Sequence, residues 1–133
     1  MKGFSVDTFE KQQAIDITVQ VESCIAAEGI EDGICLIQVP HTTCGIIVNE
    51  HFDASVSKDI LDCLDRIAPP DATYSHKEGN AHAHIKSTLV GSTQMLVIED
   101  GQLMLGTWQR ILFFEFDGPR QRRVWVKALE HRR

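Results

Sequence analysis

Alternation of apolar and polar residues is the strongest constraint that this sequence places on its fold. The segments 15–21 and 122–129 both alternate, with Ile and Val on one side and polar residues on the other. A period of two residues with β-branched side chains predicts strands that turn one face to the core and one to water. Such strands lie among helical patterns without the regular rhythm of a parallel sheet. The expected fold class is therefore α+β with mainly antiparallel sheet.

Two longer helices and several further strands are expected around these segments. Asp53 is suited to cap a helix whose apolar stripe includes Cys63 and Ile67. Asn80 can begin a second helix that runs to about Leu89, before Gly91. The other expected elements are a short helix over 22–27 closed by Gly29, strands over 4–9 and 107–116, buried strands over 34–39, 46–48 and 95–98, and a short bridge over 103–105.

Helical geometry separates the two histidines of the second helix. His82 and His84 are two residues apart, which places them about 200° apart around the helix axis, so they cannot share a ligand. Ile85 and Leu89 share the face of Ala81 and His84 at helical spacing. We therefore expect His84 to face the core and His82 to face solvent.

Length, charge and cysteine content narrow the class of protein. The 133 residues fit one domain over 1–133, and 43% hydrophobic with 24% charged residues is typical of a globular protein. A net charge of -6 argues against nucleic acid as a partner, although the run 119–123 is basic. No apolar run approaches the roughly 20 residues of a membrane helix, and the first residues do not resemble a signal segment. Four cysteines without a C-x-x-C spacing favour reduced thiols, and we expect a cytoplasmic protein that binds no membrane.

Three histidines near the ends of expected elements are the main candidates for chemistry. His41 follows a buried strand, His76 lies in an expected loop, and His84 lies in the second helix. Together they could hold Zn²⁺ with a fourth position open, or they could hold a phosphate together with the free N–H groups near Asn80. Each also has a structural interpretation, because a buried imidazole without a partner costs about 1–3 kcal/mol and is normally hydrogen-bonded.

Other polar residues stand beside buried strands. Glu115 lies between two phenylalanines, so alternation predicts either a pocket wall or a solvated outer face for it. Glu50, Gln109 and Arg120 are further candidates. Cys44 follows the His41 turn, and we interpret it as a packing residue rather than a nucleophile.

The motifs HTTCGIIVNE, NAHAHIKSTLVG, DGQLMLGTWQRI and EFDGPRQRRVWV, in this order, resemble those of the YjbQ family, described as secondary thiamine-phosphate synthases. The resemblance covers nearly the whole chain. It implies about seven mainly antiparallel strands in two packed sheets with two or three helices, and assembly into a homotrimer. Where the family commonly has Asp, this chain has His82, and Cys44 stands where a small residue is more common.

The resemblance also implies an activity that joins a pyrimidine pyrophosphate to a thiazole phosphate and releases pyrophosphate. A divalent metal, Zn²⁺ or Mg²⁺, or cationic side chains would stabilise the departing pyrophosphate. We therefore expect a small phosphorylated molecule as the partner. The expected site residues are His41, His84, Glu50 and Glu115 for catalysis, Thr42, Thr43, Asn49, Asn80, Gln109 and Arg120 for the substrate and its phosphates, and His41, His76 and His84 for the metal.

Two other functions use the same residues. The first is a trimer without enzyme activity that binds an anion or a metal ion. The second is a metal-dependent hydrolase of a small ester. The segments around His41 and His84 are expected to meet at one polar pocket in all three cases.

Overall fold

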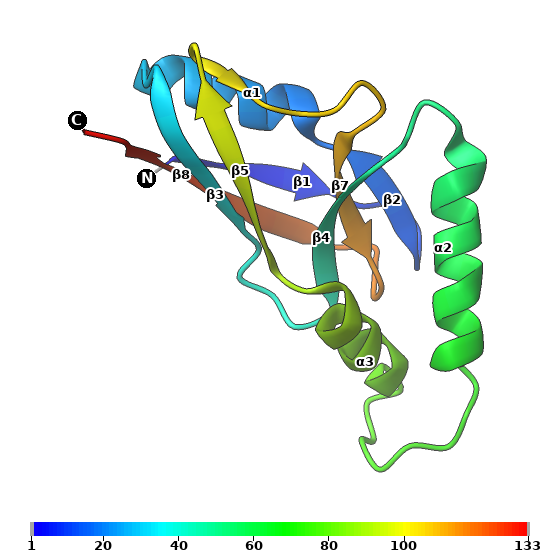
Figure 1. Cartoon of the computed structure of the whole chain (residues 1–133). Coiled ribbons are helices and arrows are strands. Elements are labelled where there is room, and N and C mark those ends of the chain that lie inside the picture. The colour runs from blue at the N-terminus through cyan, green and yellow to red at the C-terminus, as the bar shows by residue number, and fades with distance from the viewer. Residues whose placement is uncertain (1, 133) are drawn as a thin grey trace.

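The computed structural model describes residues 2–132, which form three helices and eight strands in two antiparallel sheets (Figure 1). Residues 1 and 133 of the expected domain lie outside the described residues. The expected α+β class with two packed sheets is confirmed. The five-stranded sheet has the order β1 (Lys2–Asp7), β8 (Gln121–Glu130), β3 (Asp32–Gln38), β5 (Thr93–Glu99) and β6 (Gln102–Leu103), and the three-stranded sheet has the order β2 (Gln13–Asp16), β7 (Arg110–Glu115) and β4 (Cys44–Asn49).

Three helices complete the fold, and their ends follow ordinary capping chemistry. α1 (Thr18–Glu28) ends at Gly29, whose φ of 67° is the left-handed conformation that glycine adopts easily. α2 (Ala54–Ile67) begins at Asp53, whose side chain accepts a hydrogen bond from the backbone N–H of Ser55. α3 (Ala81–Val90) ends at Gly91. None of the helices within residues 2–132 is long and apolar enough to cross a membrane.

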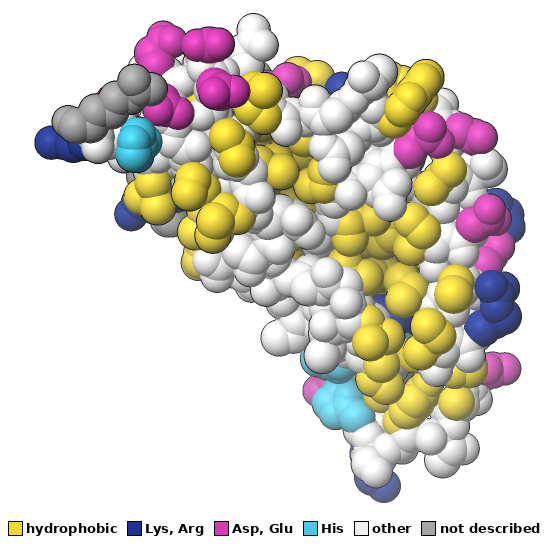
Figure 2. Space-filling view, viewed as in Figure 1, with side chains coloured by type: hydrophobic (Ala, Val, Ile, Leu, Met, Phe, Trp, Pro, Cys, Tyr) yellow, Lys and Arg dark blue, Asp and Glu magenta, His cyan; other side chains and the backbone are white. Residues whose placement is uncertain are grey.

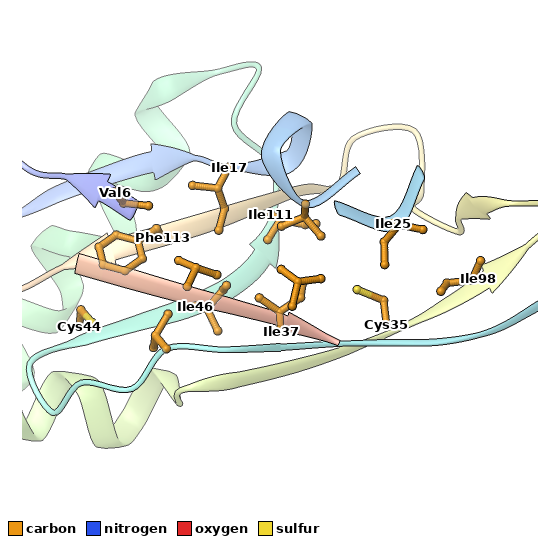
Figure 3. Packing of buried hydrophobic residues seen from close by; sticks show 14 residues of the cluster. Val6, Ile17, Ile25, Cys35, Ile37, Cys44, Ile46, Ile98, Ile111 and Phe113 are labelled. Atoms are coloured by element: carbon orange, nitrogen blue, oxygen red, sulfur yellow. The ribbon is translucent and has the colours of Figure 1, made fainter. Parts of the chain in front are cut away.

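The main core lies between the two sheets and beneath α1. Figure 3 shows Ile37 and Cys35 of β3, Ile46 of β4, and Ile111 and Phe113 of β7 pointing into one cluster. The alternate β7 residues, Leu112 and Phe114, pack on the other side of the three-stranded sheet against α2 and α3. β7 is therefore buried on both faces, and α3 is held against the sheet that carries the candidate site.

The start of α1 differs from the expected strand over 15–21. β2 ends at Asp16, and its side chain accepts hydrogen bonds from the N–H and hydroxyl of Thr18 at 3.0 and 2.6 Å. Ile17, Val21 and Ile25 are buried at a spacing of four residues. Ile17 and Val21 fit both the two-residue period of a strand and the helical period. The hydrogen bonds from Thr18 to Asp16 end the strand there, and the chain continues as a helix.

Two strands expected to be buried on both faces are buried on one. In β3, Cys35 and Ile37 are buried whereas Ile34 is exposed. In β5, Ile98 is buried whereas Met95 and Val97 are exposed. The cause is the layer order, because one face of the five-stranded sheet has no layer on it within residues 2–132.

The face of α3 that meets the sheet is the opposite of the expected one. Ala83, Lys86 and Ser87 are buried, whereas Ile85 and Leu89 are exposed. Small side chains bring α3 close to β4, where a Cβ on Gly45 would lie 2.7 Å from Cγ1 of Val90. The close approach of α3 to β4 therefore determines which face of the helix is buried, although the larger apolar side chains Ile85 and Leu89 lie on the other face. In α2, the predicted stripe is wrong at Cys63 and Ile67, which are both exposed.

Candidate functional site

The loop between β3 and β4 presents His41 at the surface. Just before it, the backbone N–H of Val39 donates to the carbonyl of Ser92 at 2.9 Å. The His41 ring is half-buried, and its Nε2 accepts a hydrogen bond from the backbone N–H of Arg123 at 2.9 Å. A hydrogen bond from β8 therefore orients the ring in addition to the two strands that flank the loop.

The contact with Arg123 assigns the protonation of His41. A backbone N–H can only donate, so Nε2 carries the lone pair and the single proton of the neutral ring lies on Nδ1. Burial lowers the pKa of His41, and the charge of Arg122 lowers it further, which favours this neutral form. His41 therefore offers an N–H donor.

A buried ion pair lies beneath the loop. Arg122 donates from Nε to Oε1 of Glu115 at 2.9 Å and from Nη2 to Oε2 of the same carboxylate. The same Nη2 donates to the hydroxyl of Thr43 at 2.8 Å. The hydroxyl of Thr8 and the backbone N–H of Asp117 also donate to Glu115. Burial raises the pKa of Glu115, but these hydrogen bonds outweigh it and the pKa is lowered, so the carboxylate stays charged.

This network changes the role expected for Glu115. The residue is fully buried and lies neither on a solvated face nor on a pocket wall. Thr43 is buried with it, and Arg122 joins both. Glu115 and Thr43 are therefore positioning residues that hold the His41 loop.

The loop before α3 and the helix itself bring two more histidines together. The rings of His76 and His84 stand edge to face, with centroids 5.2 Å apart. An apolar pocket of ≈ 400 Å³ surrounds this pair, lined by Tyr74, Ser75, His76, Ala81, His84 and Ile85.

His84 also faces His41 across a second, more polar pocket. This pocket has a volume of ≈ 360 Å³ and is lined by His41, Thr42, His84, Ser87, Thr88, Gly91 and Ser92. The expectation that the His41 and His84 segments meet at a polar pocket agrees with this geometry. We call it the histidine pocket.

Asn80 and Arg120 belong to a neighbouring cluster around Asp117. Asp117 accepts hydrogen bonds from Lys11, Asn80 and Arg120 at 3.0, 3.0 and 2.9 Å. Burial raises the pKa of Asp117, but these three donors lower it to about 2. Asn80 is the N-cap residue of α3, yet its side chain makes no capping hydrogen bond. The cluster fixes the start of α3 to the turn between β7 and β8.

Asn49, Glu50 and Gln109 lie away from the histidine pocket. β4 pairs with β7 so that Cys44 opposes Glu115 and Asn49 opposes Arg110. The five residue steps between Cys44 and Asn49 span about 17 Å in an extended strand. The Gln109 side chain accepts from the N–H of Gly106 in a local turn. The expected site residues therefore form two groups at opposite ends of the three-stranded sheet.

The three histidines do not form a metal site in this arrangement. Within residues 2–132, no three side chains of His, Cys, Asp or Glu are placed to hold a metal ion. A metal ligand needs a free lone pair, and the lone pair of His41 is used by Arg123. The ring of His41 would have to turn before it could bind a metal, and the metal stays a prediction.

Cys44 fits the packing interpretation. It is buried within the main core, and burial raises the pKa of its thiol to about 12. A thiol with so high a pKa supplies almost no thiolate at neutral pH.

A second buried cation, Lys86, was not expected from the sequence. Lys86 is fully buried, and its Nζ contacts Asp65 at 2.6 Å, Gln12 at 3.0 Å and Nδ1 of His82 at 2.8 Å. His82 is buried too, so the prediction that it faces solvent is wrong. These contacts join α3 to α2 and to the segment before β2.

Signals for both missed cations are present in the sequence. Arg122 has the same parity along β8 as Val124 and Val126, which alternation places inside. Lys86 lies three residues after Ala83 on one face of α3. In each case a buried position had to be inferred for a charged residue, against the usual preference for solvent.

The chain is an α+β protein with two antiparallel sheets, and its histidine pocket lies over a buried Arg–Glu pair. Residues 2–131 match the family model described as "UPF0047 protein YjbQ-like". The chain belongs to this family.

Relatives and solved structures agree with this assignment. A UPF0047 protein of Methanocaldococcus jannaschii is 46% identical over 95% of this chain and 91% of its own length. YugU of Bacillus subtilis is 44% identical over 97% and 98%. The crystal structure of a YjbQ/UPF0047 protein from Clostridium acetobutylicum is similar with a TM-score of 0.95, 48% identity and coverage of 97% of this chain and 100% of that one. A YbjQ-like protein from Sulfolobus solfataricus has a TM-score of 0.95, 37% identity and coverage of 98% and 96%. These comparisons establish the family and the fold of the chain. They assign no activity to it.

Proposed function

We propose that the histidine pocket binds the phosphate groups of a small substrate, and that the protein is a transferase of the thiamine-phosphate-synthase type. The observation that carries this proposal is the hydrogen bond from Arg123 to Nε2 of His41, which leaves Nδ1–H as a donor. Phosphate oxygens accept hydrogen bonds, whereas a metal ion requires a lone pair. The geometry therefore favours the anion among the ligands that the sequence left open.

The proposed reaction places charge where such donors act. The bond between the pyrimidine methylene and the pyrophosphate oxygen breaks, the thiazole nitrogen forms a bond to the same carbon, and pyrophosphate leaves. Negative charge grows on the leaving oxygen, and donors held in advance stabilise it best. His41 and His84 would contact the leaving group, with Thr42 beside them on the pocket wall.

Calorimetric titration with inorganic pyrophosphate tests the binding step. Removing one donor to a charged oxygen costs about 1.5–3 kcal/mol, so we expect His41→Ala and His84→Ala each to weaken binding roughly tenfold or more. The matched control is His131→Ala, because His131 lies at the far end of β8, away from this pocket. Unchanged affinity in both pocket variants would refute the site.

Turnover and metal content test the finer assignment. Synthase activity, followed as thiamine phosphate formed, should be lost in the His41→Ala/His84→Ala double variant. Elemental analysis of the wild type and His84→Ala tests the divalent ion that was expected from the sequence. About one equivalent per chain that disappears in the variant would favour metal-assisted chemistry over direct anion binding.

We also propose that the chain assembles into a homotrimer, as the family resemblance implies. The support is an apolar face on the five-stranded sheet, formed by Ile34, Leu36, Met95, Val97 and Leu129, which we call the outer sheet face. Strand register makes it continuous, because Ile34 stands between Val97 and Leu129, and Leu36 opposes Met95. Light scattering after size-exclusion chromatography measures the assembly directly.

A further inference from the structure

Two apolar surfaces flank the histidine pocket. One is the outer sheet face, where the side chains of Met95, Val97 and Leu129 are each more than half exposed. The other is the outward stripe of α3, formed by Ile85, Thr88 and Leu89. The pocket borders the α3 stripe at Thr88, and Ser92 in its lining directly precedes β5, the strand that carries Met95 and Val97. In Figure 2, hydrophobic side chains gather in the middle of the molecule and around α3, with histidines at its lower end.

A third exposed apolar group lies at the opposite end of β4. Phe52 and Trp108 are 61% and 62% exposed, and their rings stand edge to face with centroids 5.7 Å apart. The guanidinium of Arg110 lies 5.6 Å from the centroid of Phe52. Glu50 and Gln109 are next to them in sequence, and we call Glu50, Phe52, Trp108 and Gln109 the aromatic end. Two large exposed aromatic side chains in contact indicate an interaction site rather than ordinary surface.

The histidine pocket of one chain also lacks an available carboxylate. Among the described residues that line it there is no Asp or Glu. Of the nearby carboxylates, Glu115 and Asp117 are held by hydrogen bonds to cations, and Glu78 lies 3.8 Å from Nε2 of His76. The predicted catalytic Glu50 is separated from the pocket by the length of β4, about 17 Å. Only another chain can bring Glu50 to this pocket.

We propose that a second copy of this chain places its aromatic end against the outer sheet face and the α3 stripe of the first, so that its Glu50 and Gln109 complete the histidine pocket. This proposal rests on the function proposed above for that pocket. Contact between two different surfaces is head to tail, which buries both and can close into a ring. If two outer sheet faces met each other instead, the aromatic ends of both chains would stay exposed to water.

Charge supports the same arrangement. Glu50 and Asp53 give the aromatic end acidic side chains. Lys127 and Arg123 are exposed on the strand at the border of the outer sheet face, where Lys127 opposes Leu36. The aromatic end would therefore meet cations, which favour both the carboxylates and the ring faces.

Site-specific crosslinking tests the contact without any ligand. The background is Cys24→Ala/Cys63→Ser, because Cys63 is exposed and Cys24 is half-buried. Thr88→Cys marks the pocket rim and Gln109→Cys marks the aromatic end. With a short bismaleimide, we expect a covalent pair only when the two single variants are mixed, and a covalent ladder or closed ring from the double variant. Thr88→Cys mixed with Ala26→Cys, on the exposed side of α1, is the matched control.

Several results would overturn the proposal. They are a monomeric wild type by light scattering, crosslinks within a single variant alone, or an oligomer in which the double variant does not crosslink. Mixed oligomers then test the shared site by turnover. When Glu50→Gln and His84→Ala chains assemble at random, about one quarter of the contacts join two intact halves, so about a quarter of wild-type turnover should return. An oligomer that crosslinks but whose wild type has no synthase turnover would refute the proposed activity and leave the contact standing.

Discussion

Arg122 and Glu115 carry two opposite charges that are almost completely withdrawn from water. Arg122 is 4% exposed and Glu115 is fully buried. Desolvation of both ions is costly, and it is offset here because two parallel hydrogen bonds join them and Thr8, Thr43 and Asp117 use the remaining positions. The pair fixes the His41 loop to β7 and β8 by geometry that surface charges could not maintain.

Arg122→Met is predicted to destabilise the protein strongly. The substitution leaves Glu115 charged and buried without its partner, which costs about 3–5 kcal/mol in comparable pairs. Urea unfolding followed by circular dichroism measures the loss. Lys58→Met is the control, since Lys58 pairs with Asp62 on the exposed face of α2 and should leave the midpoint unchanged. A midpoint for Arg122→Met within error of the wild type would contradict this account.

At the scale of single elements, α3 shows what the sequence could predict and what it could not. Its existence, its start at Asn80 and its end at Gly91 follow from local signals, and they are correct. Its buried face does not follow, because the i, i+4 pattern of Ile85 and Leu89 suggests a core stripe. The helix instead turns Lys86 inward, where Asp65, Gln12 and His82 satisfy the ammonium. Those partners come from distant segments, and no local pattern identifies them.

The link between α3 and α2 is predicted to depend on pH through His82. Its Nδ1 contacts the Lys86 ammonium, so it accepts a hydrogen bond and the ring must be neutral. Burial lowers the pKa of His82, and the charge of Lys86 lowers it further, although Asp65 and Asp117 act in the opposite sense. The unfolded chain therefore binds the proton more readily. The stabilisation is complete above the unfolded pKa near 6.5 and is lost as pH falls below it.

Thermal unfolding between pH 7.5 and pH 5 measures this effect. We expect the wild-type midpoint to fall over this range, and we expect a smaller fall for His82→Gln, whose side-chain oxygen can still accept from Lys86. His41 also has a lowered pKa, so His41→Gln in the same background should flatten the remaining slope. A slope that is equal in the wild type and in His82→Gln would show that His82 is not the group that titrates.

At the scale of the whole molecule, the fold was predictable and the arrangement of the site was predictable only in part. Alternation and capping residues indicate an antiparallel α+β chain, and the structure has that class. His41 and His84 meet as expected. Glu50 does not join them, because the motif HTTCGIIVNE becomes an extended strand with its two ends far apart, and Gln109 lies at the same far end, next to Arg110, which opposes Asn49. Proximity in sequence is a poor guide to proximity in space wherever a strand intervenes.

Met95→Lys is predicted to prevent assembly while leaving the chain folded. Met95 is 65% exposed in one chain, so a lysine there is solvated and should not alter the fold. If a second copy covers the outer sheet face, the new ammonium stands where an apolar side chain packed and loses its water at the contact, and Lys127 across Leu36 adds like charge. Desolvation of one ion costs several kcal/mol, so we expect association to weaken by at least about a hundredfold. Light scattering should show a monomer with an unchanged circular dichroism spectrum, whereas Ala26→Lys on α1 should assemble like the wild type. If Met95→Lys assembled like the wild type, the outer sheet face would not be the surface that a second copy covers.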